Sequence, residues 1–312
     1  MFNAKQFINE KVNWIKQEVG DERAIAAVSG GVDSSVTAVL GFRALKDKLT
    51  VVFLDDGLMR EGEPEAVTKI FKDMGIQTRL YDVKEKFFQA MRNLTDPEEK
   101  RKAFRQTFYE TLADAARELE VKNLLQGTIA ADVVETVRGV KSQHNVLEQI
   151  GINPLQKFGF RIIEPLKELY KPEVRLVAKE LKLPDNIVNR KPFPGPGLSV
   201  RVVGEITPEK IETVRKATKI VEEEIEGLPS FQAFAVLLND KATGVNEKGE
   251  RVYGNIIVIR AVDSKDAMTA ESTRIPWDRL LKMRKRIISE IPGVSRVLYD
   301  ITSKPPATIE FE

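Results

Sequence analysis

The stretch AAVSGGVDSSVTAVL (residues 26–40) decides the fold of this chain. Two glycines, an aspartate and three serines lie between a short apolar run and a helical pattern. A glycine-rich turn between a strand and a helix presents backbone N–H groups to an anion, and the helix N-terminus adds a partial positive charge. The turn lacks the lysine of a Walker loop. A tight turn with a serine cap is the alternative, but the whole string S-G-G-V-D-S-S favours phosphate binding.

Each residue type in this turn has a distinct task. Gly30 and Gly31 allow a positive φ and a close approach of the backbone to phosphate oxygens. The serine hydroxyls are hydrogen-bond donors. Asp33 would repel a phosphate unless a cation lay between them, which favours bound Mg²⁺. The residues that we expect to hold phosphate are Ser29, Gly30, Gly31, Val32, Asp33, Ser34 and Ser35.

The first half of the chain alternates apolar runs with helical patterns. Strands are predicted near residues 23–28, 49–57, 76–83 and 123–129, with helices between them. This alternation is typical of an α/β fold, a parallel doubly wound sheet with helices on both faces. Ligands bind beyond the carboxyl ends of such strands. Asp55, Asp56 and Gly127 lie at the carboxyl ends of predicted strands, so we expect them beside the glycine-rich turn.

Two stretches interrupt this alternation. Residues 136–161 lack a clean period and are long for a connection, so we predict a mobile lid. The segment RKPFPGPGLSVRV (190–202) is rich in proline and glycine, which end regular elements. We therefore predict two domains, 1–190 and 191–312. The second is predicted to be a smaller α+β domain that contains a first strand, a helix over 208–226, two strands, a helix over 276–291 and a closing strand.

Composition excludes several classes of protein. The 312 residues include 49 Lys plus Arg and 47 Asp plus Glu, a balance that argues against a dedicated duplex-binding protein. The basic residues over 279–286 are interpreted as a solvated helix face. There is no cysteine, hence no disulfide, thiolate zinc site or cysteine nucleophile, and His144 is the single histidine. No signal or membrane-spanning run is visible, so we expect a soluble, cytoplasmic protein.

The string SGGVDSS (residues 29–35) resembles the signature of the PP-loop ATP pyrophosphatases. These enzymes cut ATP between the α- and β-phosphates. The resemblance accounts for the missing lysine: a Walker lysine helps to hold the β- and γ-phosphates during γ-transfer, whereas here both phosphates leave together as pyrophosphate. It also implies ATP with Mg²⁺ as the nucleotide and cofactor.

Segments along the rest of the chain are similar to GMP synthase. They are FLDDGLMR (53–60), DPEEKRK (96–102), LLQGTIAADVVET (124–136), KSQHNV (141–146), EPLKELYKPEVR (164–175), RKPFPGPGLSVRVVGE (190–205) and SRVLYDITSKPPATIEFE (295–312). The resemblance implies amination of XMP to GMP through an adenylyl-XMP intermediate. Because the chain begins close to the PP-loop and has no cysteine, it resembles the ATP-pyrophosphatase subunit of a two-subunit, archaeal-type enzyme. That implies ammonia from a separate glutaminase subunit.

The resemblance assigns roles on the ATP side. Residues 29–35, with Asp55 and Gly127, are expected to bind ATP, although Asp55 and Asp56 are equally suited to cap the turn that follows them. Asp33 is the first expected magnesium ligand and Asp132 the second, with a solvated loop acid as the alternative for Asp132. Catalytic roles are implied for Asp33, Lys141 and His144. The family has Asp-Asn at 55–56 and histidine at 143, so Asp56 and Gln143 are departures.

The resemblance also assigns an XMP site and a second interface. The expected XMP residues are Arg101, Arg190, Gln232, Lys304, Ile309 and Glu310. From composition and spacing alone, Arg101 is also compatible with a surface charge and Gln232 with an alternating strand position. The segment with Lys304, Ile309 and Glu310 is also compatible with a closing strand. Lys191 stands where the family often has histidine, so Arg190 is the stronger candidate of the two for binding XMP. The family uses its C-terminal domain for dimerisation, which predicts a homodimer.

Two other functions compete with this hypothesis. A PP-loop tRNA-modifying enzyme would need a sulfur-carrying cysteine or a sulfur-donating partner, and a basic RNA platform. A non-catalytic α/β nucleotide sensor would hold ATP without releasing pyrophosphate. We therefore predict no nucleic-acid or membrane partner, and the substrates XMP, ATP and ammonia.

Overall fold

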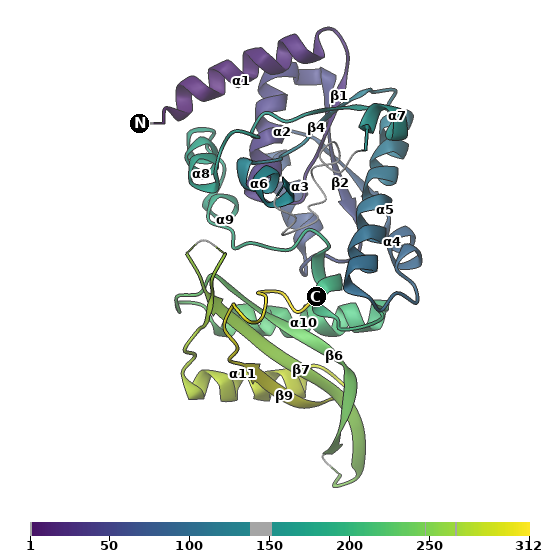
Figure 1. Cartoon of the computed structure of the whole chain (residues 1–312), viewed down its shortest axis with the longest axis vertical. Coiled ribbons are helices and arrows are strands. Elements are labelled where there is room, and N and C mark those ends of the chain that lie inside the picture. Colours follow the sequence, from purple (N-terminus) through teal and green to yellow (C-terminus); the bar gives the residue numbers. More distant parts are fainter. Residues whose placement is uncertain (1, 138–151, 247, 266) are drawn as a thin grey trace. The chain divides into compact units, whose positions relative to one another are not determined.

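A computed structural model describes residues 2–137, 152–246, 248–265 and 267–312. The chain forms two compact units. The N-terminal unit contains Met1–Asp55, Gly62–Val83 and Arg105–Arg190, and the C-terminal unit contains Asp56–Glu61, Lys84–Phe104 and Lys191–Glu312. Figure 1 shows the elements of both units, coloured along the sequence.

The N-terminal unit contains a five-stranded sheet. Its order is β3 (Thr78–Asp82), β2 (Leu49–Asp55), β1 (Ala24–Ala27), β4 (Asn123–Leu125) and β5 (Arg161–Ile163). Every neighbouring pair is parallel. The predicted parallel sheet is thus confirmed, with β1 at its centre. Strand β5 was not predicted, because it begins where the stretch without a clean period, 136–161, ends.

Helices cover both faces of this sheet. On one face, α1 (Ala4–Val19), α2 (Val32–Leu45) and α8 (Lys171–Glu180) pack together. On the other, α5 (Pro97–Glu118) packs Tyr109 and Leu112 against Ile25 and Val52. Figure 1 shows α2 and α5 on opposite sides of the strands. The doubly wound α/β class is confirmed. The other helices described in this unit are η1 (Lys46–Lys48), α3 (Glu63–Asp73), α6 (Ala130–Val137), α7 (Pro154–Phe158) and α9 (Asp185–Val188).

The C-terminal unit is the predicted α+β domain. Strand β7 (Arg251–Asp263) pairs antiparallel with β6 (Gln232–Val245) and β8 (Glu271–Ser272), and parallel with β9 (Val294–Asp300). Helices α10 (Pro208–Glu224) and α11 (Trp277–Glu290) contact each other, and the unit also contains α4 (Lys84–Ala90). The first strand expected after the proline-rich segment is wrong: Gly197–Arg201 is a 3₁₀ helix, η3, because Ser199 Oγ and Ser199 N both donate to Pro196 O.

The two units are not separated at a single point in the sequence, because each contains three segments of the chain. One change of unit falls between Arg190 and Lys191, where the sequence suggests a boundary, but residues 56–61 and 84–104 also belong to the C-terminal unit. Hydrogen bonds explain the first of these segments. Leu198 N donates to Leu58 O, and Arg215 Nε donates to Met59 O. These contacts are long-range, so no local pattern in the sequence announces them.

Within the described ranges, no helix is both long enough and apolar enough to cross a bilayer.

Candidate functional site

The glycine-rich turn lies between β1 and α2, where the sequence places it. Ser29 N donates to Ser34 Oγ at 3.2 Å, and Ser34 Oγ donates to Gly31 O at 3.1 Å. The Ser29 and Ser34 hydroxyl oxygens are 3.3 Å apart. Gly30 has a φ of +76°, but the expectation of a positive φ at Gly31 is wrong, since its φ is −69° as the N-cap of α2. The serines thus close the turn at the positive end of α2.

Asp33 is held in the first turn of α2 by a distant lysine. Lys171 Nζ, at the start of α8, donates to Asp33 Oδ2 at 2.5 Å. The other carboxylate oxygen, Oδ1, is buried and has no hydrogen-bond partner among the described residues. A buried carboxylate oxygen without a donor is suited to a hard cation such as Mg²⁺. Asp33 therefore fits the expected metal ligand.

A second distant cation contacts the same turn. A Cβ on Gly30 would lie 2.2 Å from Arg190 Nη1, so the guanidinium occupies the space that glycine leaves. Arg190 also forms an ion pair with the buried carboxylate of Glu63, at the start of α3. The turn has no basic residue of its own, and Lys171 and Arg190 bring two positive charges to it. Arg190, expected on the XMP side, is thus placed at the glycine-rich turn of the N-terminal unit.

The end of β4 packs directly on this turn. A Cβ on Gly127 would lie 2.8 Å from Asp33 C and 2.8 Å from Ser34 N, so only glycine fits there. Tyr109 OH donates to Gln126 Oε1 at 3.1 Å, and Gln126 Nε2 donates to Thr128 Oγ1 at 3.1 Å. Burial raises the pKa of Tyr109, so this phenol stays protonated as a donor. The network fixes both neighbours of Gly127.

The acidic residues expected near the turn are structurally engaged. Asp55 ends β2 and is buried, while Asp56 Oδ1 accepts the backbone N–H of Leu58 at 2.8 Å. Asp56 therefore caps its own turn, the alternative that the sequence left open. Asp132 Oδ2 accepts the N–H of Ile129 at 3.0 Å at the start of α6. In the parts of the chain that the structure describes, no three acidic, histidine or cysteine side chains form a metal cluster.

The C-terminal unit brings together three predicted XMP residues. Gln232 Nε2 donates to Pro192 O at 3.0 Å and lies 3.3 Å from Glu310 Oε1. Ile309 is buried in the apolar cluster with Phe234 and Val236. Gln232, Ile309 and Glu310 are thus fixed by the fold of this unit.

The remaining predicted residues lie apart or outside the described ranges. Lys304 Nζ donates to Ala267 O at 2.7 Å. Arg101 forms an ion pair with Glu98 one helical turn earlier. Lys141 and His144, the expected lid residues, lie outside the described residues, as does 138–151 of the predicted lid.

Lys171 and Arg201 were not predicted as site residues. Lys171 lies in the segment EPLKELYKPEVR, whose likeness to the family was the only available signal. Arg201 is almost fully buried and pairs with Glu310 through two hydrogen bonds. The proline- and glycine-rich segment that precedes Arg201 gave no sign of its partner 109 residues later.

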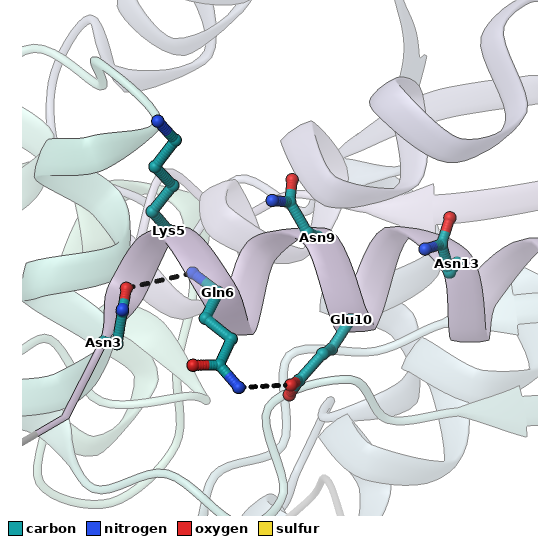
Figure 2. Close-up of a pocket in the computed structure, with 6 residues that line it drawn as sticks. All are labelled: Asn3, Lys5, Gln6, Asn9, Glu10 and Asn13. Atoms are coloured by element: carbon teal, nitrogen blue, oxygen red, sulfur yellow. Dashed lines mark hydrogen bonds between the residues drawn. The ribbon is translucent and has the colours of Figure 1, made fainter.

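A shallow hollow on α1 contains none of these residues. Figure 2 shows its lining side chains, all on or beside the first half of α1: Asn3, Lys5, Gln6, Asn9, Glu10 and Asn13. Asn3 Oδ1 accepts the N–H of Gln6 at 3.1 Å as a helix cap, and Gln6 Nε2 donates to Glu10 Oε1 at 2.8 Å. These contacts satisfy the helix itself and offer no reactive group.

Two family models match the chain in succession. The NAD synthase model matches residues 3–195, and the model of the GMP synthase C terminal domain matches residues 219–311. The first match includes the glycine-rich turn with Lys171 and Arg190. The second includes Gln232 and Glu310.

Curated relatives match over the whole length. The chain is 52% identical to the B subunit of GMP synthase (glutamine-hydrolyzing) from Methanopyrus kandleri, and the alignment covers 100% of both chains. It is also 52% identical to the protein of the same name from Pyrococcus abyssi, covering 99% of this chain and 100% of that one. The relative from Methanocaldococcus jannaschii is 52% identical with 100% of each chain covered. The similarity therefore spans both units.

Proposed function

Because the chain belongs to the family of GMP synthase B subunits, we propose that it aminates XMP to GMP at the expense of ATP. The observation that carries this proposal is the 52% identity over the full length, which includes both the phosphate turn and the residues around Glu310. The enzyme is a ligase that forms a carbon–nitrogen bond. A tRNA-modifying enzyme and a nucleotide sensor are not favoured by these relatives.

The proposed reaction has two steps. The 2-oxygen of XMP attacks the α-phosphorus of ATP, the bond from that phosphorus to its bridging oxygen breaks, and pyrophosphate leaves. Ammonia then attacks carbon 2 of the adenylyl-XMP intermediate, the bond from carbon 2 to the 2-oxygen breaks, and AMP leaves. Activation is required because a purine carbonyl oxygen is a poor leaving group, whereas AMP is a good one.

The ATP side of the site is assigned to the N-terminal unit. Residues 29–35 would bind the phosphates through backbone N–H groups and hydroxyls, and Asp55 and Gly127 would lie beside the nucleotide. Lys171 supports this proposal, because its ammonium group adds positive charge where the leaving pyrophosphate is expected. Mg²⁺ bound with ATP would neutralise phosphate charge, with Asp33 as its first ligand and Asp132 as the second candidate.

The XMP side is assigned mainly to the C-terminal unit. Lys304 would bind the phosphate of XMP through its ammonium group, a point charge, and Arg101 would bind it through its planar guanidinium group. The backbone of Ile309 and the carboxylate of Glu310 would bind polar edges of the base, with Gln232 beside them.

We retain Arg190 as an XMP residue and add that its contact with Gly30 suits phosphate binding in general. Lys141 and His144 remain proposed catalytic residues.

The proposal includes partners. The relatives are named as one subunit of an enzyme, so we propose a separate glutaminase that supplies ammonia, and a reaction in the cytoplasm. We also propose a homodimer through the C-terminal unit. Exposed apolar side chains on that unit support it, among them Trp277, Tyr253 and Ile301.

The proposed function predicts a dependence on the nitrogen source. With ATP, Mg²⁺, XMP and ammonium, the isolated protein is expected to form GMP, AMP and pyrophosphate in equal amounts. With glutamine in place of ammonium, it is expected to form GMP only after a glutaminase subunit is added, because the chain has no cysteine nucleophile. Product formation is measured by chromatography.

Each competing function gives a different result in the same assay. A nucleotide sensor releases no pyrophosphate under any condition. A tRNA-modifying enzyme needs RNA and ignores XMP. Rapid use of glutamine by the isolated chain would contradict the two-subunit proposal while leaving XMP amination intact.

A second prediction concerns Lys304. Lys304→Ala is expected to raise the KM for XMP by about 10- to 100-fold, the cost of one charge-assisted hydrogen bond to phosphate. The KM for ATP and the melting temperature should stay near wild type, because among the described residues the Lys304 ammonium group donates to a single backbone carbonyl, that of Ala267. Lys248→Ala, at an exposed turn, is the matched control and should change neither KM. A lower melting temperature with an unchanged XMP KM would make Lys304 a structural residue.

A further inference from the structure

Three buried cations in the C-terminal unit hold the segment 300–312. Lys100 and Arg260 have no exposed surface, and Arg201 is 1% exposed. Burying a cation is costly unless it is paired and hydrogen-bonded. Each of the three has a carboxylate partner in this segment, namely Glu312, Asp300 and Glu310. The segment also contains three of the proposed XMP residues, Lys304, Ile309 and Glu310. The segment is therefore fixed at several points.

Arg260 sets the course of the segment. Its guanidinium donates to Thr302 O at 2.5 Å and to Thr308 O at 3.0 Å, and it lies 3.0 Å from the carboxylate of Asp300. The residues between Thr302 and Thr308 therefore form a loop whose two ends are tied to one side chain. Ile309 and Glu310 follow directly.

Lys100 and Glu312 hold the segment beyond Glu310. Lys100 Nζ donates to the carbonyls of Val202 and Gly204, each at 2.9 Å, and pairs with the Glu312 carboxylate. Gly204 N also donates to Glu312 Oε1 at 2.9 Å. Burial lowers the pKa of Lys100, while Glu312 opposes this shift. Glu310 thus lies between two fixed points.

Arg201 fixes the Glu310 carboxylate itself. Its Nε and Nη2 atoms each lie 3.0 Å from a different carboxylate oxygen, a bidentate contact. The guanidinium carbon lies 4.0 Å from the ring centroid of Phe234 and 5.0 Å from that of Phe193. The Glu310 side chain is 19% exposed, whereas that of Arg201 is 1% exposed. Glu310 is therefore the more exposed member of the pair.

This arrangement is poorly explained by stability alone. A buried ion pair is weak evidence for stability, because desolvation offsets most of the attraction. A bidentate fork, however, fixes the plane and direction of a carboxylate, and a lysine at the same position would not. An ionised carboxylate only accepts hydrogen bonds, so its orientation decides which N–H groups of a base it meets.

We propose that Arg201 is a positioning residue for XMP, which orients the Glu310 carboxylate toward the N–H groups of the xanthine base and does not touch the substrate. This inference rests on the proposed function. Lys100, through Glu312, prevents the segment from moving away from Arg201. Together they hold the Glu310 carboxylate in one orientation before XMP binds, which lowers the conformational cost of binding.

The test is a double-mutant cycle with Arg201→Met and Glu310→Gln. Arg201→Met is expected to raise the KM for XMP by about 10- to 100-fold, with kcat at saturating XMP and the KM for ATP within about threefold of wild type. In the Glu310→Gln background, Arg201→Met is expected to raise the KM for XMP by less than about twofold further, because the carboxylate that Arg201 orients is already absent. Arg201→Lys should give an intermediate XMP KM, since it keeps the charge and loses the fork.

A matched control separates positioning from structure. Arg286→Met removes another arginine of this unit, which pairs with Glu223 and Glu224 across α10 and α11. It should lower the melting temperature without changing the KM for XMP. If Arg201→Met does not fold, the cycle with Arg201→Lys decides the question in the same way.

The outcomes are distinct. Additive effects of the Arg201 and Glu310 substitutions on the XMP KM, or an unchanged XMP KM in the folded Arg201 variants, would overturn the positioning role. Failure of the wild-type protein to form GMP from XMP would overturn the proposed function instead. Non-additive effects confined to the XMP KM would support both.

Discussion

Replacement of Lys171 by methionine is expected to lower kcat/KM for ATP by about 10²- to 10³-fold, the usual cost of removing one donor from a developing charge. The glycine-rich turn, residues 29–35, has no basic residue of its own, and Lys171 Nζ lies 2.5 Å from Asp33 Oδ2. Its side chain is 40% exposed, so the ammonium group is not locked into a buried pair. In the methionine variant, the pyrophosphate that leaves in the first step would therefore lack the stabilising positive charge of the Lys171 ammonium group. Steady-state release of pyrophosphate measures the effect.

Two variants serve as controls for Lys171. Lys179→Met removes an exposed lysine from the last turn of the same helix and should retain wild-type kinetics. Lys171→Arg keeps the charge and should recover part of the activity. If Lys171→Met releases pyrophosphate at the wild-type rate, then Lys171 only balances the charge of Asp33, and another group must neutralise the phosphates.

Gly127→Ala is expected to abolish most of the activity and to destabilise the N-terminal unit. The added Cβ would meet the backbone of Asp33 and Ser34 at 2.8 Å, and a backbone cannot swing aside as a long side chain can. Overpacking of this kind costs about 1–3 kcal/mol, which corresponds to a fall of roughly 2–12 °C in melting temperature. Because the displaced atoms carry the phosphate turn, activity should fall by more than about 100-fold. Calorimetry and the pyrophosphate assay measure the two effects.

Gly31→Ala is the matched control for Gly127. A Cβ there would meet only the Ser29 hydroxyl at 3.5 Å and the Ser34 hydroxyl at 4.0 Å, and the φ of −69° suits any residue. The melting temperature of Gly31→Ala should therefore stay at the wild-type value, even if its methyl group hinders phosphate binding. Equal losses of stability in both variants would contradict the close packing of β4 on the turn.

Local patterns in the sequence were sufficient for the central architecture. The turn at 29–35 follows a strand and opens a helix, as its residues predict, because glycine-rich turns and apolar periods depend on only a few neighbouring residues. Four of the five parallel strands, the long helix α5 and the α+β character of the C-terminal unit are recognisable for the same reason. The likeness of several separate segments to GMP synthase identified the family, and the full-length relatives confirm it.

The tertiary structure decided which charges meet. Lys171 reaches Asp33 across 138 residues, and Arg201 reaches Glu310 across 109. Lys100 is in a helix that resembles any solvated charged helix, yet it is fully buried. A charged residue has the same local pattern whether it faces water or a distant carboxylate, so its sequence neighbours carry no information about its partner. The cations that contact the phosphate turn and the Glu310 carboxylate are therefore set by long-range packing, whereas the turn itself is set by its own residues.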